Sequence, residues 1–173
     1  GACQLALVLQ AAHLAYPNRA IQLVDVVLPQ ALVIAKNTSR TVQVIFSPEA
    51  QPNGTETTAL EVISFLADQP SDTLQTHASG RLAFATIAPA APLDLAALQA
   101  RCPIAVDLAA LAAQVVAQNT YFGPSFRWLD AVWRGETEVL GRLVRPDAIG
   151  TLDGYQLHPG VLDACWQLVN ALH

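Results

Sequence analysis

Charged and sulfur-containing side chains are scarce in this sequence. Of its 173 residues, 13% are charged and three are cysteines, Cys3, Cys102 and Cys165. The cysteines stand far apart and form no C-x-x-C pair, so we expect neither a zinc site nor a disulfide scaffold. The nine basic residues form no run and the net charge is −5, which argues against a nucleic-acid partner.

The longest hydrophobic run is too short for a membrane span. Residues 2–14 are interrupted by Gln4, Gln10 and His13, and a span needs about 20 predominantly apolar residues. We therefore expect a buried helix here, in a cytoplasmic protein with reduced thiols. With 53% hydrophobic residues, the chain can form the core of one domain or of two small lobes. The low charge indicates that other protein covers part of its surface.

The order of helical and strand-like segments is typical of an α+β fold. Residues 1–16 are rich in Ala, Leu and Gln, with polar residues on no single side, which predicts a helix surrounded by protein. Val42, Val44 and Phe46 alternate with other positions, which predicts a strand over 41–46. We further expect strands at 21–35, broken by Pro29, and at 59–66, 76–84, 127–134 and 137–144. We expect turns at 47–54 and 135–136, a linker within 87–103, and helices at 107–118, capped by Asp107, and at 158–172.

This order predicts two lobes of similar plan. We place the first lobe at 1–88, a linker with a short helix at 89–118, and the start of a second lobe at 119–173. We expect this second lobe to be incomplete and to stop at its helix.

The residues from His158 to Gln167 form the most informative motif, H-P-G-V-L-D-A-C-W-Q. Asp163, Gln167 and Asn170 stand at i, i+4 and i+7, so a helix would place them on one face. The adjoining apolar face would hold Leu162, Trp166 and Val169. Taken alone, the Asp–Gln pair also fits an amphipathic helix in solvent.

Two further motifs are weaker by themselves. Residues 121–126 read Y-F-G-P-S-F, and Gly-Pro is a general turn signal. Residues 77–82 read H-A-S-G-R-L, which fits any strand that contains a glycine, and we interpret His77 as structural.

Together these motifs resemble those of polyketide-synthase dehydratase domains. The first is similar to their H-P-x-x-L-D-x-x-x-Q motif, the second to their Y-G-P-x-F segment, and the third to their H-A-x-G-x-L strand. The resemblance implies an α+β double hotdog, with the first hotdog nearly complete and the second only begun. It implies dehydration of a β-hydroxyacyl thioester to an α,β-enoyl thioester. Asp163 would be the catalytic acid, and Gln167 would hold its carboxyl group.

The resemblance also implies how the substrate arrives and binds. It would come on the phosphopantetheine arm of an acyl carrier protein, with no metal and no other cofactor. Gly1 and Ala2, at the start of the first helix, would polarise the thioester carbonyl. The substrate tunnel would be lined by Tyr121, Gly123, Pro124, Phe126, His158, Pro159 and Leu162. Expected partners are neighbouring synthase domains and a second copy in a homodimer of the parent synthase, but no nucleic acid and no membrane.

The sequence departs from the family at its catalytic base. The family's base is a histidine in H-x-x-x-G-x-x-x-x-P, and this spacing follows none of His13, His77, His158 and His173. The family's proline precedes a glycine-alanine pair, and this chain begins with Gly1 and Ala2. We therefore expect a domain that is incomplete at both ends and inactive alone, with unpaired strand edges that make it poorly soluble or self-associating.

Two other functions stay open at this point. One is a dehydratase-like domain that isomerises a double bond or cyclises a chain, and Asp163 argues against the isomerase. The other is a non-catalytic structural module of a megasynthase.

Overall fold

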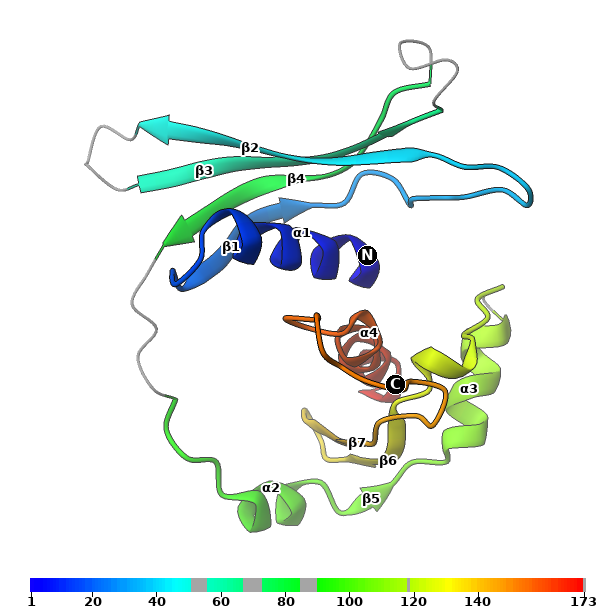
Figure 1. The fold of residues 1–173 in the computed structure, drawn as a ribbon. Helices are drawn as coiled ribbons and strands as arrows, with labels where there is room; N and C mark the ends of the chain where they lie inside the picture. Colours follow the sequence, from blue (N-terminus) through cyan, green and yellow to red (C-terminus); the bar gives the residue numbers. More distant parts are fainter. Residues whose placement is uncertain (51–55, 67–72, 85–89, 118, 173) are drawn as a thin grey trace. The chain divides into compact units, whose positions relative to one another are not determined.

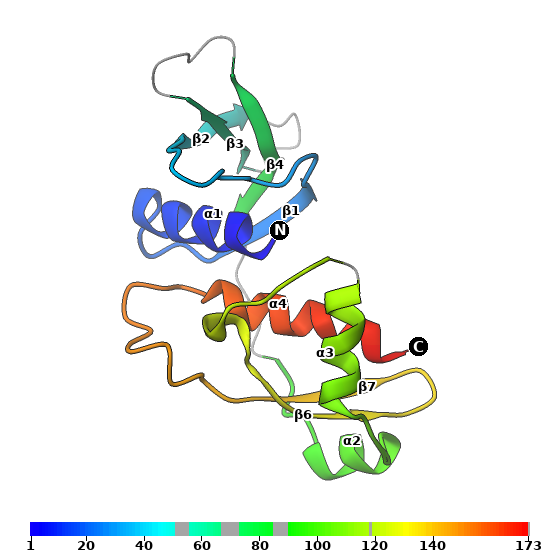
Figure 2. The same ribbon diagram turned by 90° about the vertical axis from the view of Figure 1, so that its right-hand side faces the viewer.

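The structure is a computed structural model that describes residues 1–50, 56–66, 73–84, 90–117 and 119–172. The chain divides into two compact units, Cys3–Ala88 and Pro89–His173. Each unit has its own antiparallel sheet and its own hydrophobic clusters, and both are drawn in Figures 1 and 2.

In the first unit, a helix lies along one face of an antiparallel sheet (Figure 1). Its described elements are α1 (Ala2–Ala15), β1 (Ile21–Val27), β2 (Thr41–Ala50), β3 (Glu56–Phe65) and β4 (Gln75–Phe84). The strand order in this sheet is β1-β4-β3-β2, and every neighbouring pair is antiparallel. This confirms the predicted helix and the antiparallel strands that follow it.

The core of this unit lies between α1 and the sheet. Val8 and Ala12 of α1 are fully buried against a cluster that includes Leu60, Val62, Ala78 and Leu82. Val42, Val44 and Phe46 pack against the same cluster, which confirms the alternation predicted for this strand. The expectation of a helix buried on all sides is wrong, because Leu14 is 72% exposed and Leu7 is exposed as well.

A hydrogen-bonded polar network lies inside the first unit. His77 and Ser64 are fully buried, and Ser64 Oγ lies 2.7 Å from His77 Nε2. Arg40 Nε donates to Ser64 Oγ at 2.8 Å, and Gln4 Nε2 donates to the His77 carbonyl at 3.0 Å. These contacts account for the burial of His77 and agree with its interpretation as structural.

Two strand limits differ from the predicted ones. Strand content was expected over 21–35 with a break at Pro29; β1 ends at Val27, two residues before this proline, which has no amide hydrogen for a ladder, and the described residues between it and β2 form no strand. The turn expected at 47–54 is wrong for residues 47–50, because β2 continues to Ala50, and residues 51–54 lie outside the described residues. Glu49 of this extension pairs with Arg81 of β4, so a contact across the sheet supports it.

The second unit contains more short elements than expected. They are α2 (Leu95–Arg101), β5 (Ile104–Ala105), α3 (Leu108–Ala117), η1 (Pro124–Phe126), β6 (Leu129–Arg134), β7 (Val139–Leu143), α4 (Pro159–Gln167) and η2 (Leu168–Leu172). The described strands form a sheet in the order β5-β6-β7, and Gly135-Glu136 lies in the β6–β7 turn, as predicted.

The helices of the second unit begin at side-chain caps. Asp107 Oδ1 accepts the Ala109 amide at 2.8 Å, which confirms the predicted cap of α3. Asp94 Oδ1 accepts the Ala97 amide at 3.0 Å and begins α2, a helix in a region where the sequence pattern predicted a linker. In the described residues, no helix combines the length and the hydrophobicity that crossing a bilayer requires.

Candidate active site on helix α4

Helix α4 begins at a histidine cap followed by a proline. The Gly160 amide donates to His158 Nδ1 at 3.0 Å, so the imidazole takes the place of the usual Ser or Asp side chain. Pro159 occupies the first helical position, where its missing amide hydrogen has no cost. The buried residues of α4 are Gly160 and Ala164, and Ala164 belongs to a cluster with Trp128 and Ile149.

The structure brings Asp163 and Gln167 into direct contact. Gln167 Nε2 donates to Asp163 Oδ2 at 2.8 Å, and this hydrogen bond is partly buried. The spacing of four residues on an α-helix produces this pair. This hydrogen bond orients the Asp163 side chain through Oδ2 and does not involve the other carboxyl oxygen, Oδ1.

Asp163 and Gln167 line a small depression, called here the Asp163 hollow, of about 150 Å³. Its lining comes from α3, the segment after α3, α4 and η2. The lining residues are Val115, Thr120, Phe122, Asp163, Trp166, Gln167 and Asn170. The predicted face of Asp163, Gln167 and Asn170 is therefore present, although η2 continues α4 as a tighter 3-10 turn.

A second depression, the apolar hollow, adjoins the first. It measures about 330 Å³, and Val115, Thr120, Phe122 and Gln167 line both hollows. Its other lining residues are Leu108, Leu111, Ala112, Val116, Phe126, Arg127 and Leu129. The carboxyl group thus stands beside a mostly apolar space bounded by α3 and the segment around η1.

The predicted tunnel residues differ in whether they line a hollow in the structure. Phe126 lines the apolar hollow, where its ring stacks on Phe122 with centroids 6.2 Å apart. Tyr121 is 75% exposed and lines neither hollow, because Phe122 is the aromatic residue of this segment that turns inward. Gly123 and Pro124 are exposed. Their predicted contact with substrate stays a prediction.

The other predicted site residues lie at helix starts. Leu162 and Pro159 are half-buried in the first turn of α4, and His158 caps that turn. Gly1 and Ala2 stand at the start of α1. Neither hollow is lined by any of these five residues.

Trp128 is a site residue that no sequence motif indicated. It is 5% exposed, its indole Nε1 donates to the Ser125 carbonyl at 2.9 Å, and its ring lies 5.2 Å from that of His158. A Cβ built on Gly160 would overlap this indole. Trp128 therefore joins the Y-F-G-P-S-F segment to the H-P start of α4, a connection between two motifs that are distant in sequence.

Burial lowers the pKa of His158 below its ordinary value. The residue is 9% exposed, and its ring lies 5.2 Å from that of Trp128 and 4.8 Å from that of Tyr155. Loss of hydration disfavours the charged imidazolium, so the neutral form is favoured here.

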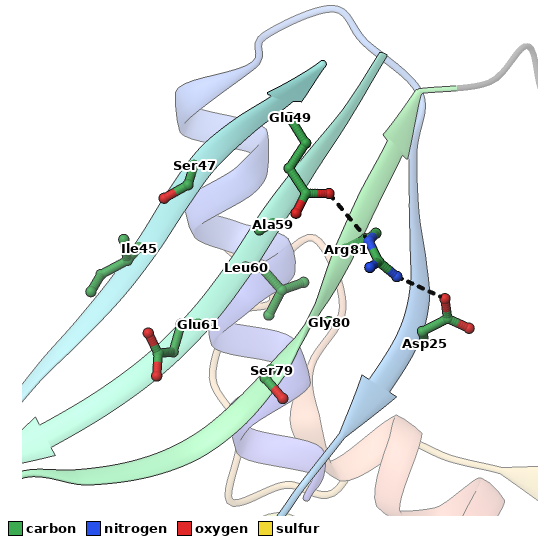
Figure 3. A pocket seen from close by; sticks show the side chains of 10 residues that line it. All are labelled: Asp25, Ile45, Ser47, Glu49, Ala59, Leu60, Glu61, Ser79, Gly80 and Arg81. Atoms are coloured by element: carbon green, nitrogen blue, oxygen red, sulfur yellow. Dashed lines mark hydrogen bonds and ion pairs between the residues drawn. The ribbon is translucent and has the colours of Figure 1, made fainter. Parts of the chain in front are cut away.

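A further pocket, of about 400 Å³, lies on the sheet of the first unit and has a different character (Figure 3). Arg81 lies between Asp25 and Glu49, at 3.2 Å from each carboxylate. Its charged, ion-paired lining contrasts with the apolar hollow beside Asp163 and does not suit an apolar acyl chain.

A family model described as the N-terminal domain of polyketide synthase dehydratases matches residues 90–173. The dehydratase domain from the CurJ module of the curacin polyketide synthase is 35% identical, with a TM-score of 0.85 over 99% of this chain and 57% of that chain. The chain belongs to the polyketide synthase dehydratase family. An inactive mutant of the CurJ dehydratase in complex with a compound is also 35% identical, with a TM-score of 0.91 and the same coverage.

Curated relatives of this dehydratase chain are far longer. Polyketide synthase ThaG of Burkholderia thailandensis is 34% identical over 129 residues, which are 72% of this chain and 2% of ThaG. Mycoketide-CoA synthase of Mycobacterium tuberculosis is 32% identical over 88 residues, 51% of this chain and 2% of the synthase. The chain thus spans 57% of the CurJ dehydratase structures and 2% of these two synthases. The double-hotdog fold predicted from the motifs agrees with these structures, and the chain represents part of it.

Proposed function

We propose that this chain is part of a polyketide synthase dehydratase that converts a β-hydroxyacyl thioester into an α,β-enoyl thioester and water. The observation that carries the proposal is the Asp163–Gln167 hydrogen bond at the edge of an apolar hollow. The hollow offers an acyl chain a place to be buried, and the carboxyl group stands where a proton can be given to a hydroxyl group beside that chain.

In this reaction Asp163 acts as the general acid. Gln167 donates to Oδ2, which leaves Oδ1 to carry the proton. A base removes the α-proton, the electrons of that C–H bond form the new Cα=Cβ bond, and the Cβ–O bond breaks. The departing hydroxyl takes the proton of Asp163 and leaves as water. The scheme needs proton transfers alone, so no metal or redox cofactor is proposed.

A histidine is the proposed base. The CurJ dehydratase, 35% identical to this chain, is inactive as a histidine-to-phenylalanine mutant. His13, His77, His158 and His173 lack the family's spacing, so we propose that none of them is the base and that these 173 residues do not catalyse dehydration by themselves.

The remaining contacts follow from the same reaction. Gly1 and Ala2 are proposed to polarise the thioester carbonyl, because backbone amides at a helix N-terminus favour developing negative charge. The thioester is proposed to arrive on the phosphopantetheine arm of an acyl carrier protein, within a dimeric, cytoplasmic synthase that supplies neighbouring domains. Relatives such as ThaG and mycoketide-CoA synthase are themselves synthases, which supports this setting.

Replacing Asp163 by Asn in the complete dehydratase domain tests the proposal. Asn keeps the size of the side chain and can still contact Gln167, but it has no carboxyl proton to give. We expect the dehydration rate of a β-hydroxyacyl thioester to fall by about 100-fold or more, the usual contribution of a general acid. Asp153→Asn, in the exposed loop before α4, is the matched control and should leave the rate unchanged.

The products separate the alternatives. An enoyl thioester lost in the Asp163→Asn variant supports dehydration. A near wild-type rate in that variant contradicts the assignment of the acid. A shifted double bond or a cyclised product from the unmodified domain would instead favour an isomerase or a cyclase.

A further inference from the structure

The cap of α4 depends on the protonation state of one imidazole. The Gly160 amide donates to His158 Nδ1 at 3.0 Å, so that nitrogen must carry a lone pair. In the neutral ring the hydrogen therefore sits on Nε2. A protonated imidazole carries hydrogens on both nitrogens and has no acceptor, so the cap exists in the neutral form alone.

The surroundings of His158 favour that neutral form. The residue is 9% exposed, and its ring packs against Trp128 and Tyr155. Of these two ring contacts, Tyr155 is the titratable side chain, and the ion pairs found among the described residues do not include His158. With no carboxylate partner in the described part of the chain, burial decides the direction, and the pKa of His158 lies below its ordinary value.

The cap lies one helical turn before Asp163. In an α-helix the Asp163 amide bonds to the carbonyl of Pro159, the residue directly after the cap. Opening of the first turn therefore removes the support of the Asp163 backbone. Gly160, the residue bonded to His158, also lies against the Trp128 indole, and Trp128 is bonded to Ser125 of η1. Trp128 thus contacts both the start of α4 and the segment that lines the apolar hollow.

We propose that His158 is a positioning residue for Asp163: its neutral imidazole caps α4 and holds the general acid in place, and its protonation releases the first turn. The proposal rests on the proposed function of Asp163. It assigns His158 a role within the chain in place of the predicted substrate contact, because Nδ1 accepts the Gly160 amide and the ring packs against Trp128 and Tyr155.

The sign of the pH dependence follows from the lowered pKa. Between the folded and the unfolded pKa of His158, the unfolded chain binds a proton that the folded chain does not. The contribution to stability is complete above about pH 6.5, the ordinary value for histidine, and is lost as the pH falls below it. Activity that depends on the cap should fall over the pH range in which the folded-state imidazole itself becomes protonated.

Two variants of the complete dehydratase domain test whether His158 acts as a helix cap or contacts substrate. His158→Asn keeps an acceptor at the cap position and cannot be protonated, whereas His158→Ala removes the acceptor. The matched control is His13→Asn, which removes an exposed histidine of α1. The measurements are kcat and KM from about pH 5 to about pH 8, on either side of the ordinary histidine pKa. Each is made at a temperature where the variant is fully folded, and the NMR shift of the Gly160 amide is followed over the same range.

We expect His158→Ala to lower kcat about tenfold or more with KM little changed, as for a misplaced catalytic group. His158→Asn should restore kcat at neutral pH and should gain activity relative to the wild type as the pH falls. The Gly160 amide should titrate in the wild type and in His13→Asn, but not in His158→Asn.

Each opposite result overturns the proposal. Full kcat in folded His158→Ala, failure of Asn to restore it, or a Gly160 amide that does not titrate would each do so. A rise in KM with unchanged kcat would restore the substrate-contact role. The amide titration is independent of catalysis, so it can succeed even if Asp163→Asn shows that the proposed function is wrong.

Discussion

Replacement of Gly160 by Ala should destabilise the start of α4 through a steric conflict with Trp128. A Cβ at residue 160 would lie 2.7 Å from Trp128 Cδ1 and 2.8 Å from the Ser125 carbonyl oxygen, where ordinary contact begins at 3.4 Å. Neither neighbour can move freely, because the indole is 5% exposed and is hydrogen-bonded to that same carbonyl at 2.9 Å. The added methyl group therefore acts as overpacking of a closed site.

The magnitude combines two opposing effects. Overpacking costs about 1–3 kcal/mol, and the better helix propensity of Ala returns at most about 1 kcal/mol. We expect the free energy of unfolding to fall by about 1–2 kcal/mol, measured by urea denaturation of the complete domain and followed by far-UV circular dichroism. Gly150→Ala is the control, since a Cβ there meets no atom within 4 Å. It should change stability by about 0.5 kcal/mol or less.

A double-mutant cycle with Trp128→Phe shows whether the indole is the cause. Phe lacks the indole nitrogen and leaves room beside residue 160, so the double mutant should be more stable than the sum of the single changes predicts, by about 1 kcal/mol. Additive effects, or a Gly160→Ala variant at least as stable as Gly150→Ala, would refute the steric reasoning.

Two predictions concern other parts of the chain. Ser64→Ala removes the hydroxyl that contacts His77 Nε2 at 2.7 Å and accepts from Arg40 Nε, so urea denaturation should show a loss of about 1–3 kcal/mol, whereas Ser39→Ala, at an exposed position, should be nearly neutral. Val116→Trp, on the wall of the apolar hollow, should raise the KM for long acyl thioesters and leave the KM for short ones unchanged. Ala113→Trp is the control, because Ala113 is not part of that wall, and it should leave both KM values unchanged. An equal effect of the two variants would contradict the role of the hollow.

Sequence patterns predicted those helices and strands that are determined by neighbouring residues in the chain. Alternation of Val42, Val44 and Phe46 predicted a strand, and Asp107 predicted a helix start, because both signals lie within a few residues. Helix α2 was missed because its Ala- and Pro-rich surroundings are typical of a linker, although Asp94 is the same kind of cap as Asp107. The extension of β2 through Glu49 could not be predicted, since its partner Arg81 comes from another strand.

The candidate site also has one part that local sequence predicts and another that depends on tertiary packing. The Asp163–Gln167 pair follows from i, i+4 spacing on a helix, so the sequence alone sufficed to predict it. The contribution of α3 to both hollows, the inward turn of Phe122 in place of Tyr121, and the position of Trp128 depend on packing between distant segments. No single stretch of sequence contains that information.

The amino-acid sequence by itself determined the family, the α+β plan and the pairing of Asp163 with Gln167, since short motifs and helical periodicity act over one or two turns. Tertiary structure alone decided that the His158 ring packs against Trp128 and that Asp163 stands beside an apolar hollow. Burial and cavity shape arise when elements far apart in the chain pack together and exclude water, so the sequence of one segment does not show which other segments will cover it.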